Sequence, residues 1–203
     1  MQIILVRHGE SIGNFENRLQ GQADYDLTDL GRGQARRTAD RLHALGTRAI
    51  YSSHLLRAHA TAQAIADRLG LSAVITEDVA EYHFGEMSGA TYAEIREKLG
   101  AIANPAERIY PGEEGRDAFF ARVTNAVFRI ADDHPEESVA IVSHGGPIAL
   151  FCQHVLGLPY KRPMPFSIDN CSLNVVHVDA NRSAERSLRL VRLNDTCHLD
   201  GLT

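Results

Sequence analysis

Four short clusters of polar residues contain the side chains that binding and attacking an anionic substrate would need. In chain order they are Arg7-His8-Gly9, Ser52-Ser53 with Arg57, Glu81, and His144-Gly145. Arginine carries a permanent charge on a planar group that fits phosphate oxygens. Histidine titrates near neutral pH, a carboxylic acid can exchange a proton, and glycine lets the backbone approach an anion closely. Together the clusters predict an anion pocket that holds a nucleophile and an acid.

Each cluster follows a segment that is typical of a buried strand. The four segments are short aliphatic runs, rich in β-branched residues, at 3–6, 49–52, 73–76 and 139–142. In an open parallel sheet, ligands bind in the crevice at the carboxyl ends of the strands. If these strands run parallel, we therefore expect the four clusters to converge at one edge of the sheet.

Amphipathic helical patterns between the strands favour an α/β fold with a parallel sheet core. One pattern begins at Thr28, a credible helix N-cap, and ends at Gly46. Further helices are expected at 55–69, at 116–133 and from about 147 to 156. Two final strands are expected at 173–178 and 187–193, with an exposed turn near Asn181 between them.

The segment at about 82–114 mixes aromatic residues, glycines and prolines, and it interrupts this alternation. We interpret it as a small cap-like insertion, with a short helix near 91–99, within a single domain of residues 1–203. Its large side chains either line a substrate pocket or pack the insertion itself, and the sequence leaves both alternatives open. The residues concerned are Tyr82, Phe84, Met87, Tyr92 and Tyr110.

The composition is that of an ordinary globular protein, with 44% hydrophobic and 23% charged residues in a chain of 203. The formal net charge of −5 argues against nucleic-acid binding, which usually needs a basic face. No apolar stretch approaches the length of a membrane span, so no membrane partner is expected. Three widely spaced cysteines without a C-x-x-C motif indicate reduced thiols in a cytoplasmic protein. His54 and His59 are five residues apart, which does not place them on one helical face as a metal-binding pair.

The order of several motifs resembles the histidine phosphatase superfamily, also called the phosphoglycerate mutase-like family. The segment Leu5-Val6-Arg7-His8-Gly9-Glu10-Ser11 matches its signature, and Asn14 fits the asparagine that follows. The other matching blocks are, in order, Gln20-Gly21, Leu27-Thr28 with Gly31 and Gln34-Ala35, Ser53 to Ala62 around Arg57, Glu81 to Gly89, Val142 to Gly146, and Asn194 to Leu199. Ordered blocks of this kind are far more specific than an Arg-His-Gly tripeptide alone.

The resemblance implies a three-layer α/β/α sandwich around a mostly parallel sheet with one antiparallel strand. It also implies that His8 attacks phosphorus in line and becomes phosphohistidine. Glu81 would protonate the leaving alkoxide and then take a proton from the water that hydrolyses the intermediate. The groups that would bind the phosphate are Arg7, Arg57, His144, Asn14, Gln20, Gly21 and the Gly145 amide. This chemistry requires neither a metal nor a cofactor.

The resemblance leaves three activities to weigh. A phosphatase that hydrolyses a small phosphorylated metabolite is the first, because the 82–114 insertion is short and its only basic residues are Arg96, Lys98 and Arg108. A phosphoglycerate mutase-type phosphoryl transfer is the second. A non-catalytic module that binds phosphorylated ligands is the third, and it is disfavoured because the nucleophile and both arginines are retained. The substrate, a role for Glu113 at the pocket rim and the oligomeric state, with a homodimer as one alternative, stay open.

Overall fold

The computed structural model describes residues 1–99, 110–159, 165–179 and 187–202. Part of the predicted insertion, including Arg108, and the predicted turn near Asn181 lie outside these residues. Within them, none of the helices has the length and apolar character that crossing a membrane would require.

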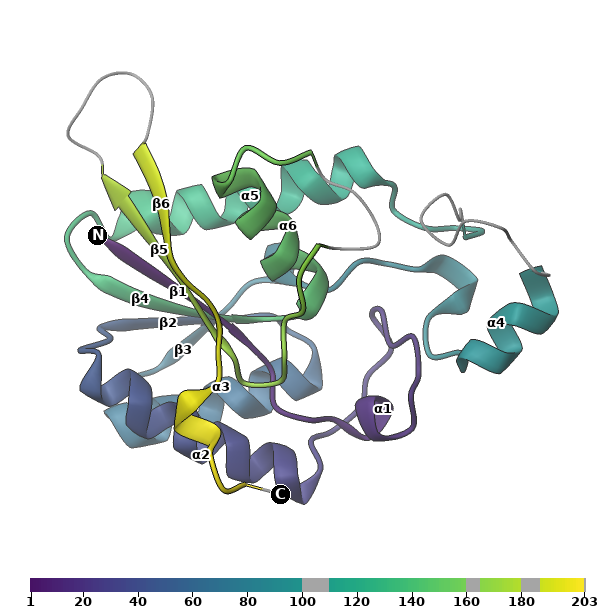
Figure 1. The fold of residues 1–203 in the computed structure, drawn as a ribbon, viewed down its shortest axis with the longest axis horizontal. Coiled ribbons are helices and arrows are strands. Elements are labelled where there is room, and N and C mark those ends of the chain that lie inside the picture. Colours follow the sequence, from purple (N-terminus) through teal and green to yellow (C-terminus); the bar gives the residue numbers. More distant parts are fainter. Residues whose placement is uncertain (100–109, 160–164, 180–186, 203) are drawn as a thin grey trace.

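The described residues form a six-stranded sheet with helices on both faces (Figure 1). The strands are β1 (Gln2–Arg7), β2 (Ala49–Ser52), β3 (Ala73–Ile75), β4 (Ser138–Ser143), β5 (Leu173–Asp179) and β6 (Ser187–Asp195). Each strand lies within one or two residues of a predicted segment. The short β-branched runs therefore located the strands correctly.

The strand order across the sheet is β3-β2-β4-β1-β5-β6. The pairs β1 with β4, β4 with β2, and β2 with β3 are parallel. Strand β5 is antiparallel to both of its neighbours, β1 and β6. The sheet is thus mostly parallel with one antiparallel strand, as the resemblance implied. Because β1 to β4 all point the same way, their carboxyl ends meet at one edge.

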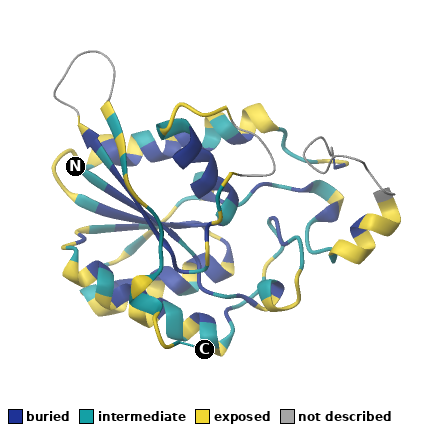
Figure 2. Ribbon diagram, in the orientation of Figure 1, coloured by how far each residue is buried: buried dark blue, intermediate teal, exposed yellow. Residues whose placement is uncertain are grey.

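The buried side chains of β1 alternate between the two faces of the sheet. Ile4 and Val6 pack with helices α2 and α3, whereas Ile3 and Leu5 pack with α5 and α6. These helices are α2 (Asp29–Ala44), α3 (Leu56–Leu69), α5 (Arg116–Asp133) and α6 (Gly145–Val155). Figure 2 shows the buried central strands between the two helical layers. The three-layer sandwich is confirmed, and burial on both faces explains why the central strands β1 and β4 are continuous aliphatic runs.

The helix after β4 begins two residues earlier than expected. Its first residue is Gly145, whereas the sequence predicted a start near Pro147. Proline fits anywhere in the first turn of a helix, because the amide hydrogens there have no partner within the helix. The third position is therefore as acceptable to Pro147 as the first. The earlier start brings the amides of Gly145 and Gly146 to the carboxyl end of β4.

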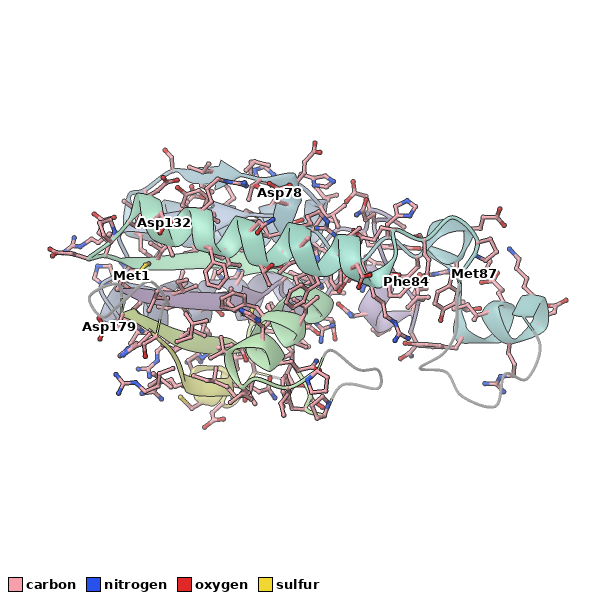
Figure 3. The ribbon with its side chains drawn as sticks, turned by 90° about the horizontal axis from the view of Figure 1, so that it is seen from above. Met1, Asp78, Phe84, Met87, Asp132 and Asp179 are labelled. Atoms are coloured by element: carbon pink, nitrogen blue, oxygen red, sulfur yellow. The ribbon has the colours of Figure 1, made fainter. Side chains whose placement is uncertain are left out.

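The described part of the insertion contains a 3-10 helix, η2 (Gly85–Met87), and α4 (Tyr92–Leu99), which lies beyond the end of the sheet (Figure 1). Figure 3 shows Phe84 and Met87 on this side of the molecule, past the end of α5. Four of its five large side chains are buried and belong to the core cluster of α5 and α6: Tyr82, Phe84, Met87 and Tyr110. They pack the insertion, and Tyr92, at 58% exposed, is the exception.

Two glycines allow the loop after β1 to lie directly against the first turn of α2. A Cβ on Gly9 would lie 2.5 Å from the carbonyl oxygen of Gly31, and a Cβ on Gly31 would overlap the carbonyl oxygen of Glu10. The same Glu10 carbonyl accepts a hydrogen bond from the Thr28 amide at 2.9 Å. The backbone that follows His8 is therefore fixed by backbone-to-backbone packing.

Replacing Gly31 by alanine tests this packing. In an ordinary helix, Gly→Ala stabilises by up to about 1 kcal/mol. At Gly31 we expect the opposite, a loss of roughly 1–3 kcal/mol, because the added methyl group forces the Glu10 backbone to move. Urea unfolding measures both changes.

Gly33→Ala, in the same helix, is the matched control. A Cβ there makes only ordinary contacts, 3.8 Å from Leu202 and 3.9 Å from Arg36, so this variant should be at least as stable as the wild type. Equal unfolding midpoints for the two variants would contradict the proposed packing.

Candidate active site

His8 directly follows β1 and is buried, with 2% of its surface exposed. Its Nδ1 lies 2.7 Å from the Gly9 carbonyl oxygen, and its Nε2 lies 3.3 Å from Nε of Arg57. A carbonyl oxygen can only accept a hydrogen bond, and a guanidinium can only donate one. These partners select the neutral tautomer with its hydrogen on Nδ1. The lone pair is therefore on Nε2, which is the atom able to act as a nucleophile.

Arg57 lies in the first turn of α3 and is 1% exposed. Its Nη1 and Nη2 donate to the carbonyl oxygens of Ala23 and Gly21 at 2.9 and 2.7 Å. Burial lowers the pKa of Arg57 to about 10, although the negative charge of Glu81 opposes this effect. The guanidinium therefore keeps its charge at neutral pH. It is a permanent cation held against His8 by the loop that follows β1.

Burial and nearby cations hold the pKa of both site histidines well below the usual value of 6.5. For His8 the largest cause is burial, followed by the positive charges of Arg57 and Arg7. For His144 burial is again the largest cause, followed by the charge of Arg57. Both imidazoles are consequently neutral at neutral pH, which is the state that a nucleophilic histidine needs.

His144 directly follows β4, and its ring centroid lies 5.1 Å from that of His8. Its Nε2 lies 2.9 Å from the hydroxyl of Ser53, which accepts a hydrogen bond from the Leu55 amide at 3.2 Å. In the tautomer with the imidazole hydrogen on Nδ1, the Ser53 hydroxyl donates its own hydrogen to Nε2. His144 Nδ1 is buried and has no hydrogen-bond partner among the described residues. Ser53 thus orients His144 with one donor still available.

Arg7, the last residue of β1, brings a second guanidinium to the same edge of the sheet. Its Nη1 donates to the Ile168 carbonyl oxygen at 2.6 Å. Its Nε is buried and has no partner in the part of the chain that the structure describes. A Cβ on Gly145, the first residue of α6, would lie 3.9 Å from this Nε. A guanidinium donor therefore lies beside the N-terminus of a helix, and both features favour an anion.

The Glu81 carboxylate reaches the same helix N-terminus. It accepts hydrogen bonds from the amides of Tyr82 and Gly146 at 2.8 and 3.1 Å. A Cβ on Gly146 would overlap this carboxylate, so the close approach requires glycine there. The negative charge of Glu81 acts on both Arg7 and Arg57. All four predicted clusters therefore converge, as expected from a parallel sheet.

The three predicted phosphate contacts in the loop after β1 have different surroundings. Asn14, in α1 (Ile12–Phe15), accepts the Ser11 hydroxyl hydrogen on its Oδ1 at 2.9 Å, which leaves its Nδ2 as a donor. Gln20 is buried, and its Oε1 lies 2.8 Å from the same Ser11 hydroxyl, whose single hydrogen is donated to one of the two oxygens at a time. The carbonyl oxygen of Gly21 binds the buried guanidinium of α3. Gln20 and Gly21 thus support the framework of the site, and their contact with phosphate stays a prediction.

Two residues that hold the backbone of His8 and Gly9 were not found from the sequence. Asn170 Nδ2 donates to the His8 carbonyl oxygen at 2.9 Å and to Asn14 Oδ1 at 3.3 Å. The Thr61 hydroxyl accepts a hydrogen bond from the Gly9 amide at 3.0 Å. Asn170 lies just before β5, and no spacing pattern relates it to His8. Thr61 lies in one of the family blocks, which was the only available signal.

The remaining histidines near the site do not form a metal centre with their neighbours. His54 and His59 are exposed, and His83 Nδ1 accepts a hydrogen bond from the Gly85 amide at 3.1 Å. Over residues 1–99, 110–159, 165–179 and 187–202, no three His, Cys, Asp or Glu side chains lie close enough together to hold a metal ion.

Glu113, whose role at the pocket rim the sequence left open, is half-buried.

Several known proteins are similar to this chain over most of its length. Phosphoglycerate mutase-like protein 4 of Arabidopsis thaliana is 41% identical over 155 residues, which cover 72% of this chain and 67% of that protein. Phosphoserine phosphatase 1 of Hydrogenobacter thermophilus is 32% identical, with 98% and 94% of the two chains covered. A mycobacterial glucosyl-3-phosphoglycerate phosphatase has a similar structure, with a TM-score of 0.85, 29% identity, and 95% and 98% of the chains covered.

The family itself follows from a match that spans nearly the whole chain. The model of the histidine phosphatase superfamily (branch 1) matches residues 3–196. This range contains all four polar clusters and, apart from Gln2 at the start of β1, all six strands of the sheet. The chain therefore belongs to the histidine phosphatase superfamily.

Proposed function

We propose that this protein is a phosphatase that hydrolyses a small phosphorylated metabolite through a phosphohistidine intermediate on His8. The observation that carries the proposal is the buried His8 imidazole, whose Nε2 lies 3.3 Å from Nε of Arg57. The lone pair can attack phosphorus, and the adjacent cation attracts the phosphoryl group to it. The Arg57 Nε–H, which donates to Nε2 in the free enzyme, would turn to a phosphoryl oxygen when substrate binds.

In the first step, His8 Nε2 forms a bond to phosphorus while the bond from phosphorus to the ester oxygen breaks. The transferring group carries its charge on three equatorial oxygens, so it needs donors that are already in place. The donors that support this role are the Arg57 guanidinium, the buried Nε of Arg7 and the Nδ1 of His144. Asn14 Nδ2 and the Gly145 amide would complete the pocket.

Glu81, in its protonated carboxylic acid form, is the proposed proton donor to the leaving alkoxide, and it becomes a carboxylate in this step. In the second step its carboxylate takes a proton from water, whose oxygen attacks the phosphohistidine and releases inorganic phosphate. The amides of Tyr82 and Gly146 hold the carboxylate at the edge of the pocket, where a leaving group opposite His8 would lie. A single carboxyl group thus acts as acid and then as base.

Relatives with both kinds of name match the chain. One that covers 98% of it is a phosphoserine phosphatase, and the similar structure is a glucosyl-3-phosphoglycerate phosphatase. The Arabidopsis relative is called mutase-like, and further relatives, 31% identical, are probable phosphoglycerate mutases. The preference for hydrolysis rests on the first two. Residues 82–114 would act as a cap over the pocket. We further propose a cytoplasmic location, which the three free cysteines support.

Substituting the nucleophile tests this function. Purified enzyme would be assayed for free phosphate with p-nitrophenyl phosphate, phosphoserine, glucosyl-3-phosphoglycerate and 3-phosphoglycerate. We expect His8→Ala to lower kcat by about 10⁴-fold or more, as loss of a nucleophile does elsewhere, and His59→Ala, on the exposed face of α3, to be unaffected.

Each other outcome of that assay has a meaning. Movement of phosphate between positions of phosphoglycerate without free phosphate would favour the mutase. Turnover of no compound, or full activity in His8→Ala, would contradict the proposed function. Binding of these compounds without turnover would point to the non-catalytic module.

The charge state of His8 gives a test that is independent of substrate. Phosphate monoesters titrate near pH 6 themselves, so nitrogen NMR of the His8 ring is preferable to a rate profile. We expect His8 to remain neutral at pH 6.5 and to gain a proton only at clearly lower pH, because burial and two cations lower its pKa. Arg57→Met removes one of these cations and should move the titration to higher pH.

Arg68→Met is the control for that titration. Arg68 also lies on α3, but it pairs with Asp40 on the exposed surface, at 2.7 Å, and its removal should leave the His8 titration unchanged. A His8 pKa at its ordinary value in the wild type would contradict the proposed electrostatics.

A further inference from the structure

The segment that carries the acid is held by side chains from other elements. Every backbone carbonyl oxygen from residue 78 to residue 81 accepts a hydrogen bond from such a side chain. The Ser143 hydroxyl, at the end of β4, donates to the Val79 carbonyl at 2.6 Å. Gln22 Nε2 donates to the Glu81 carbonyl at 3.1 Å. The largest share of these hydrogen bonds comes from a third residue, Arg122 of α5.

Arg122 uses all five of its N–H donors on this region. Its Nη1 donates to the carbonyl oxygens of Asp78 and Ala80, both at 3.0 Å. Its Nη2 donates to the Glu81 carbonyl at 3.4 Å and to Glu114 Oε1 at 2.8 Å, and its Nε donates to Glu114 Oε2 at 3.1 Å. No donor remains for a substrate, so any effect of Arg122 on the reaction must pass through the groups that it holds.

Glu114 extends this arrangement to the other side of the acid. Its Oε1 accepts a hydrogen bond from the His83 amide at 2.8 Å while it pairs with Arg122. The pair is largely shielded from solvent, with 20% and 17% of the two side chains exposed, and the guanidinium lies 5.2 Å from the Phe119 ring centroid. A two-point ion pair in such surroundings is more rigid than an exposed one. It therefore fixes the backbone before and after Glu81.

We infer that Arg122, braced by Glu114, is the positioning residue that holds Glu81 where it can protonate the leaving group. The inference rests on the function proposed above. Proton transfer to an ester oxygen requires the carboxyl group within hydrogen-bond reach as the phosphorus–oxygen bond breaks. A displacement of about 1 Å in such a group costs roughly 10²-fold in rate. The binding of phosphate, in contrast, uses groups that Arg122 does not touch.

The dependence of kcat/KM on the leaving group separates this role from a general loss of structure. This parameter covers the steps up to phosphohistidine formation, in which Glu81 acts as an acid. p-Nitrophenolate is a stable anion and leaves without a proton, whereas the alkoxide of phosphoserine needs one. We expect Arg122→Met to lower kcat/KM for phosphoserine by about 10²-fold and to change that for p-nitrophenyl phosphate little. If phosphoserine is not turned over, another alkyl phosphate accepted by the wild type replaces it.

Both kcat/KM values are measured on one enzyme preparation. An unfolded fraction lowers both equally, so it does not distort their ratio. Arg122→Lys keeps the charge but not the five-donor planar group, and we expect it to resemble Arg122→Met. Arg129→Met is the matched control. Arg129 lies on the same helix, and its ion pair with the Asp78 carboxylate, at 2.6 Å, is on the exposed surface. Figure 3 shows Asp78 beside α5. The Arg129→Met variant should keep the wild-type ratio of the two kcat/KM values.

Glu81→Gln separates failure of this inference from failure of the proposed function. We expect this variant to lower kcat/KM for phosphoserine more than that for p-nitrophenyl phosphate. Adding Arg122→Met to it should change the ratio of the two kcat/KM values no further. A selective effect of Glu81→Gln with a wild-type ratio in Arg122→Met would overturn the positioning role alone. A wild-type ratio in both variants would overturn the acid assignment as well. Recovery of the ratio by Arg122→Lys would show that only the charge of Arg122 matters, which also contradicts the inference.

Discussion

A buried arginine beside an uncharged histidine is the interaction on which this site depends. Removing a guanidinium from water is costly unless its donors are satisfied. Arg57 meets that condition with the carbonyl oxygens of Gly21 and Ala23 and with the nitrogen of His8. The loop after β1 must therefore return to α3, and His8 must present a lone pair to it. The contact thus links the charge of His8, its tautomer and the path of the loop, together with burial and the Gly9 carbonyl oxygen.

The rest of the fold brings rigid parts to that contact. Parallel strands deliver Arg7, His8 and His144 to one edge of the sheet, and their burial on both faces prevents a shift in register. Glycine allows two of the closest approaches, at Gly31 against the loop and at Gly146 against the Glu81 carboxylate. Arg57 and Glu81 come from segments outside the sheet, and for the segment that contains Glu81 we infer that Arg122 supplies the support.

Most of the fold was predictable because strands buried on both faces have an unmistakable aliphatic pattern. His8 and His144 were predictable as candidate site residues because each directly follows such a strand, and Arg57 and Glu81 because the blocks around them match the family. Residues that act through a single hydrogen bond from a distant element, such as Asn170 and Arg122, leave no local pattern. The start of α6 was misplaced because Pro147 is equally compatible with the first and third helical positions. The sequence could not show which large side chains of 82–114 are buried. Their burial depends on packing against α5, and no local pattern records that contact.

The central claim is that Nε2 of His8 receives the phosphoryl group. The most direct measurement is the site of phosphorylation in Glu81→Gln after acid-free quenching of its reaction with p-nitrophenyl phosphate. This variant retains the nucleophile and lacks the base that hydrolyses the intermediate. Mass spectrometry locates the residue, and phosphorus NMR distinguishes the two ring nitrogens. The account predicts phosphate on Nε2 of His8; phosphate on Nδ1, on His144 or on no histidine would contradict it.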